Sequence, residues 1–134
     1  MTRIVDTIVI HCTDSPQGRG DTAATVHAWH LARGWAGIGY HYVILEDGTV
    51  ERGRPLYWVG SHARGNNAHS IGICLIGRDE FTEKQIDALR AMVNRLLLTY
   101  PGAEVCGHRD LDNGKTCPNF DVRYWLRTGE VCKY

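Results

Sequence analysis

A short apolar run near the N-terminus limits the folds that this chain can adopt. The run extends from Ile4 to Ile10, consists mostly of β-branched residues and is interrupted only by Asp6 and Thr7. An apolar segment without strict alternation predicts a central strand that is covered on both faces. His11 follows directly, so we expect it at the carboxyl end of this strand, where open α/β sheets gather their ligands. A histidine that stands alone at a strand end is more often structural.

Two helices are expected to cover such a sheet. The clearer one begins with a capping box at 82–85, and its apolar residues recur at helical spacing until Pro101 ends it. The other begins at Asp21 or Thr22, continues to about residue 33 and is closed by Gly34. Its expected buried face consists of Ala24, Ala28, Leu31 and Trp35.

Two histidines lie on the flank of this N-terminal helix. His27 and His30 are three residues apart, whereas the zinc-binding helix of metalloproteases needs a spacing of four and an adjacent glutamate. We therefore expect both side chains to pack or to form hydrogen bonds rather than to bind a metal.

Further strands are expected beside the central one. Residues 39–45 and 50–52 form a hairpin around an Asp-Gly turn, and alternation places Tyr40, Tyr42 and Ile44 on one face of it. The remaining elements are strands at 71–76 and 103–106 and a short closing helix at 120–126. These elements predict an α/β fold of the mixed α+β type, with a central mixed β-sheet flanked by helices on both faces. Residues 1–134 are expected to form a single domain.

The composition argues against several classes of partner. Fifteen Lys and Arg residues balance fifteen Asp and Glu residues, so no basic surface indicates nucleic acid or an anionic membrane. The N-terminus lacks the apolar core and cleavage site of a signal peptide, and no segment approaches transmembrane length. Five cysteines form no disulfide framework, which fits a chain made in a reducing cytoplasm. We expect no nucleic-acid binding and no stable membrane association.

The chemistry is concentrated in residues 107–118, which read GHRDLDNGKTCP. Turn-forming residues and Pro118 indicate an irregular loop, and loops on a rigid scaffold commonly carry function. His108 and Cys117 are both zinc-ligand types, but two ligands do not make a site. A third ligand must come from elsewhere in the chain, and His11 is the best candidate. Three protein ligands with one open position are the arrangement of a catalytic zinc site.

Such a centre suits hydrolysis of an amide. Two neutral imidazoles and one thiolate leave a net positive charge on Zn²⁺, which lowers the pKa of a bound water to about 7. A thiol hydrolase that uses Cys117 with His108 is a weaker alternative, which zinc would inhibit and a chelator would not.

Three other residues are candidates for contacts with a ligand. Tyr40 lies at the start of the predicted hairpin, where a core aromatic is more common than a catalytic phenol. His62 and Asn67 belong to a long polar loop at 58–70 and are able to hydrogen-bond a sugar or a peptide. A solvated loop is an equally good interpretation.

Several motifs occur in a compatible order along nearly the whole chain. They are IVIHCT, WHLARGWxxIGYHYVI, DGTVERGR, GSHARGNNAHSIGICLIG, GHRDL and KTCPNFD. Together they resemble the zinc-dependent N-acetylmuramoyl-L-alanine amidases, most closely the phage lysozyme-type amidases, which are relatives of the peptidoglycan recognition proteins. The resemblance implies that His11, His108 and Cys117 bind zinc. It also implies that Tyr40 and Lys115 are catalytic and orient the water or stabilise the oxyanion.

The resemblance further implies a substrate and a context. The substrate would be peptidoglycan, cut at the amide between N-acetylmuramic acid and the L-alanine of the stem peptide. Without a signal segment or a wall-binding repeat, we expect a compact, monomeric endolysin that is made in the host cytoplasm. It would reach the wall after a holin permeabilises the membrane. The longer N-terminal arm that some phage relatives use to inhibit an RNA polymerase is largely missing, so that function is not expected.

Two alternatives concern function rather than fold. A non-catalytic peptidoglycan-binding module would have the same fold, but the intact His11, His108 and Cys117 argue against it. A bacterial wall-recycling or prophage amidase would have the same chemistry in another context, and the sequence does not separate it from an endolysin.

Overall fold

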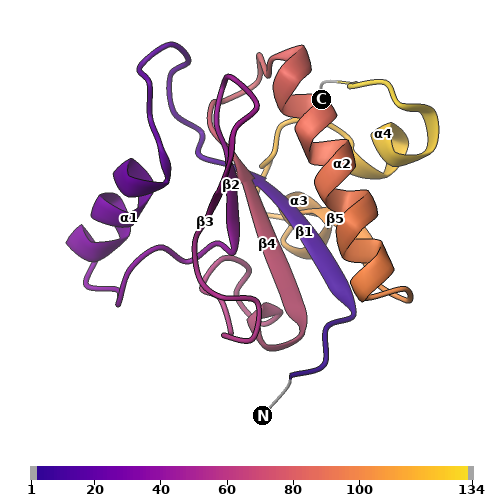
Figure 1. The fold of residues 1–134 in the computed structure, drawn as a ribbon, viewed down its shortest axis with the longest axis horizontal. Coiled ribbons are helices and arrows are strands. Elements are labelled where there is room, and N and C mark those ends of the chain that lie inside the picture. Colours follow the sequence, from indigo (N-terminus) through magenta and orange to yellow (C-terminus); the bar gives the residue numbers. More distant parts are fainter. Residues whose placement is uncertain (1–2, 133–134) are drawn as a thin grey trace.

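The computed structural model describes residues 3–132 and has a five-stranded sheet at its centre (Figure 1). The strands are β1 (Thr7–Cys12), β2 (Tyr42–Ile44), β3 (Val50–Arg52), β4 (Ser70–Leu75) and β5 (Glu104–Gly107), in the spatial order β3-β2-β4-β1-β5. Strands β2, β4, β1 and β5 run parallel, whereas β3 pairs antiparallel with β2. The predicted mixed sheet is therefore confirmed.

The central strand, β1, begins later than the apolar run predicts. Ile4 is 83% exposed, and pairing with both neighbouring strands begins only at Thr7, which lies opposite Ser70 and Glu104. Apolar composition continues past the point at which the neighbouring strands start, so it misplaces this boundary. All six residues of β1 are buried, and His11 is one of them. His11 is the last residue but one of β1, so it lies at the carboxyl end of the strand, as expected.

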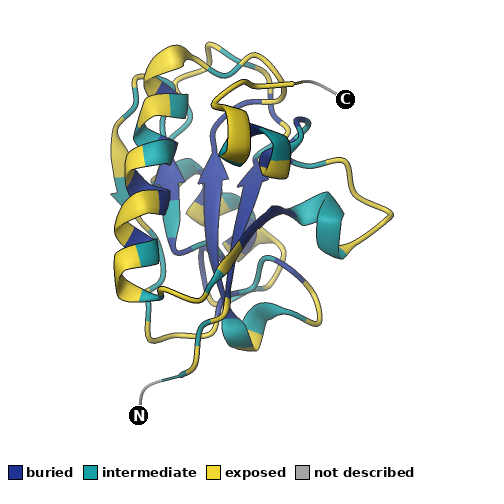
Figure 2. Ribbon diagram, turned by 90° about the vertical axis from the view of Figure 1, so that its right-hand side faces the viewer, coloured by how far each residue is buried: buried dark blue, intermediate teal, exposed yellow. Residues whose placement is uncertain are grey.

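One face of the sheet is covered by α2 (Glu83–Thr99) and α4 (Val122–Thr128). The predicted capping box is present: Thr82 Oγ1 accepts a hydrogen bond from the Gln85 N–H, and Gln85 Oε1 accepts one from the Thr82 N–H. Figure 2 shows the buried strands behind α2, whose outer side is exposed. The core between these layers includes Ile8, Ile10, Ile71, Ile73, Leu89, Val93, Phe120 and Trp125.

The opposite face carries α1 (Ala23–Ala32) and α3 (His108–Leu111), together with the loop that contains the short helix η1 (Asn67–His69). Helices therefore lie on both faces, as predicted. None of the helices in residues 3–132 is long and apolar enough to cross a membrane.

The buried face predicted for α1 is wrong. Val26 and His30 are its buried residues, whereas Leu31 is 49% exposed and Ala24 and Ala28 also face solvent. Figure 1 shows α1 standing to one side of the sheet. It packs through Val26 onto a small cluster that includes Ile38 and Val43, so only a narrow stripe of the helix is covered.

The two histidines of α1 form the hydrogen bonds expected of them. Nδ1 of His27 accepts from the Ile38 N–H at 3.0 Å, and Nδ1 of His30 accepts from the Gly39 N–H at 2.9 Å. Both bonds tie the helix to the segment that leads into β2.

The predicted hairpin is confirmed, but its first strand is shorter than expected. Because β2 begins only at Tyr42, the side chains of residues 39–41 do not have to alternate between the two faces of the sheet. Tyr42 and Ile44 pack toward α2, whereas Tyr40 packs with Val43 on the opposite face. The expectation that these tyrosines share a face is therefore wrong, and Tyr40 instead lies on the same face as His11.

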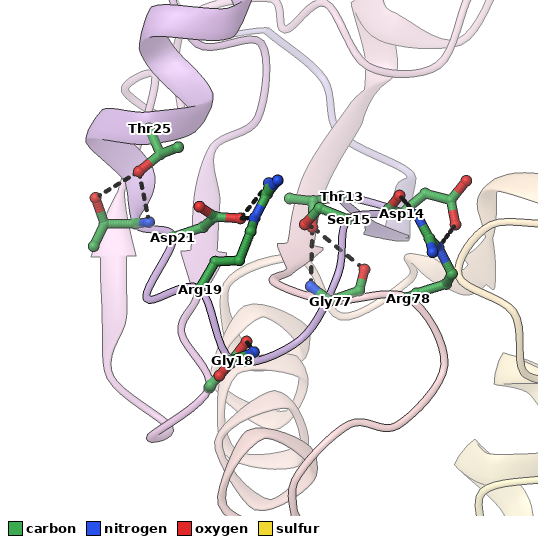
Figure 3. A network of polar contacts seen from close by, with 11 residues as sticks. Thr13, Asp14, Ser15, Gly18, Arg19, Asp21, Thr25, Gly77 and Arg78 are labelled. Carbon is green, nitrogen blue, oxygen red and sulfur yellow. Dashed lines mark hydrogen bonds and ion pairs between the residues drawn. The ribbon is translucent and has the colours of Figure 1, made fainter.

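The segment that follows β1 is fixed by polar contacts (Figure 3). The Gly77 N–H donates to Thr13 Oγ1 at 2.9 Å, and Arg78 forms an ion pair with Asp14 at 3.1 Å. Arg19 pairs with Asp21 just before α1. These contacts hold Asp14 beside the site described next.

Candidate active site

The three predicted metal ligands meet at one place. His11 projects from β1 on the face opposite α2, and β5 runs beside β1 with Gly107 opposite Ile10. His108 follows Gly107, so this register places two imidazoles side by side, with ring centroids 4.6 Å apart. Cys117 completes the group: one donor atom from each of the three residues lies within 4.8 Å of the others.

Cys117 is held in place by backbone groups on both sides. Its Sγ accepts a hydrogen bond from the Cys12 N–H at 3.0 Å, and its carbonyl accepts one from the Arg109 N–H at 3.0 Å. The Cys12 side chain and burial raise the pKa of the Cys117 thiol. A bound cation reverses this preference, because a thiol that coordinates a metal loses its proton.

The stretch 107–118 is more regular than predicted. Residues 108–111 form one helical turn, which Asp110 caps by accepting the Gly107 N–H at 2.8 Å. The expected turn follows, with Asp112 Oδ1 accepting the Gly114 N–H at 2.9 Å. The carboxylates of Asp110 and Asp112 therefore both accept hydrogen bonds from backbone N–H groups.

Burial prepares the two imidazoles for binding a cation. It lowers the pKa of His11 well below the usual value, and the nearby rings of His62 and His108 lower it further. Burial, followed by the Lys115 ammonium, lowers the pKa of His108. Both rings are therefore neutral near pH 7, which is the form of histidine that binds metals.

The triad lines a cleft of about 780 Å³ that also contains the two predicted catalytic residues. The ring of Tyr40 lies 5.1 Å from that of His11. Burial raises the pKa of the Tyr40 phenol, so it remains an O–H donor at neutral pH. Lys115 is exposed on the cleft wall and adds a positive charge there.

The two residues predicted to contact a ligand, His62 and Asn67, line the same cleft, but protein groups already engage them. Nδ1 of His62 lies 2.8 Å from His11 Nε2, and its Nε2 lies 3.2 Å from Ser70 Oγ. Asn67 Oδ1 accepts the N–H groups of His62 and Ala63 at 2.9 and 2.8 Å. Their contact with a sugar or a peptide stays a prediction.

Several residues of the cleft wall escape prediction from the sequence. Arg33, Arg64 and Asp14 line it, as does Trp35, whose ring packs against that of His30 at an angle of 51°, with centroids 4.5 Å apart. The only signal for Arg64 is its place in the long polar loop. Arg33 closes an ordinary helix, and no local pattern marks it.

Comparison with known proteins identifies the family. The family model described as N-acetylmuramoyl-L-alanine amidase matches residues 1–120. The endolysin of Enterobacteria phage K11 is 38% identical over 130 residues, which cover 91% of this chain and 85% of that protein. The endolysin of Escherichia phage T7 is 37% identical over 134 residues, covering 94% and 88%. The solved structure of the N-acetylmuramoyl-L-alanine amidase LysC from Clostridium intestinale URNW matches with a TM-score of 0.82 at 34% identity, covering 93% of this chain and 83% of that one. The chain therefore belongs to the N-acetylmuramoyl-L-alanine amidase family.

Proposed function

We propose that this protein is a zinc-dependent N-acetylmuramoyl-L-alanine amidase that acts as a phage endolysin. It hydrolyses the amide between N-acetylmuramic acid and the L-alanine of the peptidoglycan stem peptide. The observation that carries this function is the convergence of His11, His108 and Cys117 in one cleft. Family membership and the endolysins among its relatives support it.

The three side chains fit zinc. Zn–N and Zn–S bond lengths of about 2.0 and 2.3 Å place the donor atoms of a tetrahedral site roughly 3.3–3.6 Å apart. The donor atoms here lie within 4.8 Å of one another, so a closure of about 1 Å completes the site. No fourth His, Cys, Asp or Glu joins the group within residues 3–132, which leaves a coordination position for water or substrate. Zinc bound there would polarise the amide carbonyl and make a water nucleophilic at neutral pH.

Tyr40 and Lys115 would act on the oxygen atoms of the reaction. The half-buried phenol of Tyr40 donates a hydrogen bond to the carbonyl oxygen as it gains negative charge, or it orients the attacking water. The Lys115 ammonium adds positive charge on the same cleft and serves the same two tasks. One well-placed donor to an oxyanion lowers the barrier by about 3 kcal/mol.

The proposal includes the organisation and cellular setting of the protein. Residues 1–134 act as a single catalytic domain and a monomer. The protein is made in the host cytoplasm and gains access to peptidoglycan once a holin has permeabilised the membrane. A non-catalytic peptidoglycan-binding module of the same fold is the second candidate, because the same cleft would then bind peptidoglycan without cutting it.

Mass spectrometry of fragments released from purified peptidoglycan tests both candidates. The digestion is run with the protein as prepared, with a zinc chelator, and with zinc restored. The amidase should release free stem peptides and leave the glycan intact, with activity lost on chelation and recovered with zinc. Binding to the wall without release, at full zinc occupancy, would instead establish the recognition module.

A further inference from the structure

A chain of hydrogen bonds lies behind the proposed zinc ligand His11. His11 Nε2 is 2.8 Å from Nδ1 of His62, and His62 Nε2 is 3.2 Å from Oγ of Ser70. Ser70 Oγ is 2.7 Å from the backbone oxygen of Asn66. The chain therefore ends on a carbonyl, which accepts hydrogen bonds and cannot donate them.

That carbonyl sets the direction of every bond in the chain. Ser70 has one hydroxyl proton and donates it to the Asn66 oxygen, so Ser70 Oγ accepts from the Nε2–H of His62. Neither partner of the half-buried His62 ring is an anion, so the ring is neutral and its Nδ1 is an acceptor. That atom accepts the Nε2–H of His11, and His11 is left with an unprotonated Nδ1.

We propose that His62, Ser70 and the Asn66 carbonyl form a positioning relay that fixes the tautomer of His11 and presents its Nδ1 to zinc. This role presupposes the zinc centre of the proposed function. A histidine that binds a metal through one ring nitrogen usually donates the N–H of the other to a partner. Loss of that partner typically lowers metal affinity by roughly 10- to 100-fold. His62 thus acts through His11 and is not itself a ligand.

The fold reserves space for the His62 ring in one orientation. A Cβ placed on Gly72 of β4 would lie 2.6 Å from Cγ of His62, and one on Gly60 would lie 2.6 Å from its Cδ2. Any side chain at either position would push the ring away. Asn67 fixes the backbone beneath the ring by accepting the N–H groups of His62 and Ala63. The glycines leave room for the His62 ring, and Asn67 holds the His62 backbone, so both keep the ring in contact with His11.

The direction of the relay is tested by NMR of ¹⁵N-histidine-labelled protein. Long-range ¹H–¹⁵N correlations distinguish protonated from unprotonated ring nitrogens. In the zinc-free protein we expect both His11 and His62 to carry their proton on Nε2. On addition of zinc, the Nδ1 signal of His11 should shift. A proton on Nδ1 of His11 in the zinc-free protein, or coordination through its Nε2, would overturn the relay.

The contribution of the relay is measured by competition for zinc against a chromophoric chelator, without reference to activity. His62→Leu should lower zinc affinity roughly 10- to 100-fold. His62→Gln should restore most of it, because a carboxamide accepts at one atom and donates at another. Ser70→Ala keeps both rings and removes the acceptor that selects the His62 tautomer. It should give a mixture of tautomers and a smaller loss of affinity, and it carries the test if His62→Leu does not fold.

The matched control is His69→Gln, which alters the same loop at a side chain paired with the exposed Asp6. Its zinc affinity should equal that of the wild type. Wild-type zinc affinity in both His62→Leu and Ser70→Ala, with wild-type histidine tautomers in Ser70→Ala, would overturn the inference, as would an equal loss of affinity in the control. A wild-type protein that binds no zinc would refute the proposed function itself. A protein that binds zinc but is indifferent to His62 and Ser70 would refute only the relay.

Discussion

Replacing Tyr40 with phenylalanine removes one hydroxyl and keeps the ring. The ring centroid lies 5.1 Å from that of His11 and 5.5 Å from that of His30, and the ring packs beside Val43. These contacts belong to the ring and persist in phenylalanine. We therefore expect Tyr40→Phe to fold and to bind zinc as the wild type does, so any change in rate reports on the hydroxyl alone.

The expected loss follows from the chemical state of that hydroxyl. Burial raises the pKa of Tyr40, so the phenol is a hydrogen-bond donor throughout the neutral range. Removal of one preorganised oxyanion donor costs about 3 to 4 kcal/mol, or roughly 100- to 1,000-fold in kcat. The oxyanion exists only in the transition state, so KM should change little.

The assay measures the initial rate of stem-peptide release from purified peptidoglycan, together with the zinc content of the same sample. Tyr57→Phe is the matched control, because Tyr57 is 67% exposed and is not among the residues that line the cleft. It should keep the wild-type rate. A Tyr40→Phe variant that retains more than half of the wild-type rate would refute a catalytic role, and one that loses zinc would assign Tyr40 to the structure of the metal centre.

Four other outcomes are expected. Lys115→Ala should keep zinc and slow turnover in the same assay, and loss of metal would make Lys115 structural. Cys117→Ser should lose zinc and activity together, because a neutral hydroxyl is a poor substitute for a soft thiolate; full activity would remove Cys117 from the metal shell. Gln85→Leu should lower the free energy of unfolding, measured by urea titration, by about 1–3 kcal/mol. The substitution removes the 2.8 Å hydrogen bond from the Gln85 side chain to the buried Ile76 carbonyl. A loss well below this range would contradict that explanation. In the zinc-free protein, the free energy of unfolding should fall as the pH drops from about 6.5 to about 4. Burial lowers the pKa of His30 to about 4, so between these two pH values the His30 ring binds a proton only in the unfolded chain. Urea titrations across this pH range measure the effect, and a flat profile would contradict it.

Elements with local signals could be predicted from the sequence. The capping box of Thr82 and Gln85 and the helical spacing that follows are properties of the segment itself, and α2 begins where they predict. Convergence of His11 with His108 was also predictable, because parallel neighbouring strands carry their carboxyl ends to the same edge.

Features that depend on distant partners could not be predicted. The buried face of α1 is set by Val26 packing on Ile38 and Val43, which lie outside the helix. Tyr40 turns toward His11 because strand pairing begins two residues later, at Tyr42. The helical turn at 108–111 is only four residues long, too short for periodicity to reveal. For the buried face of α1 and the direction of Tyr40, the deciding contacts are with residues outside the local segment, whereas the turn at 108–111 is too short to give a periodic signal.

The loop at 58–70 shows why the distinction matters for function. From the sequence, a polar loop with histidines is equally well a ligand-binding loop or a solvated one, because the deciding distance joins His62 to a side chain 51 positions away. In the structure, that loop supplies hydrogen bonds behind a proposed metal ligand. A substitution in it that weakens zinc binding would lower activity and would be taken for loss of substrate contact in a lysis assay. The proposed ligands come from β1, α3 and the loop that contains Cys117, whereas the hydrogen bonds behind His11 come from β4 and the loop at 58–70. Zinc content must therefore be measured before any residue of the loop at 58–70 is assigned to substrate binding.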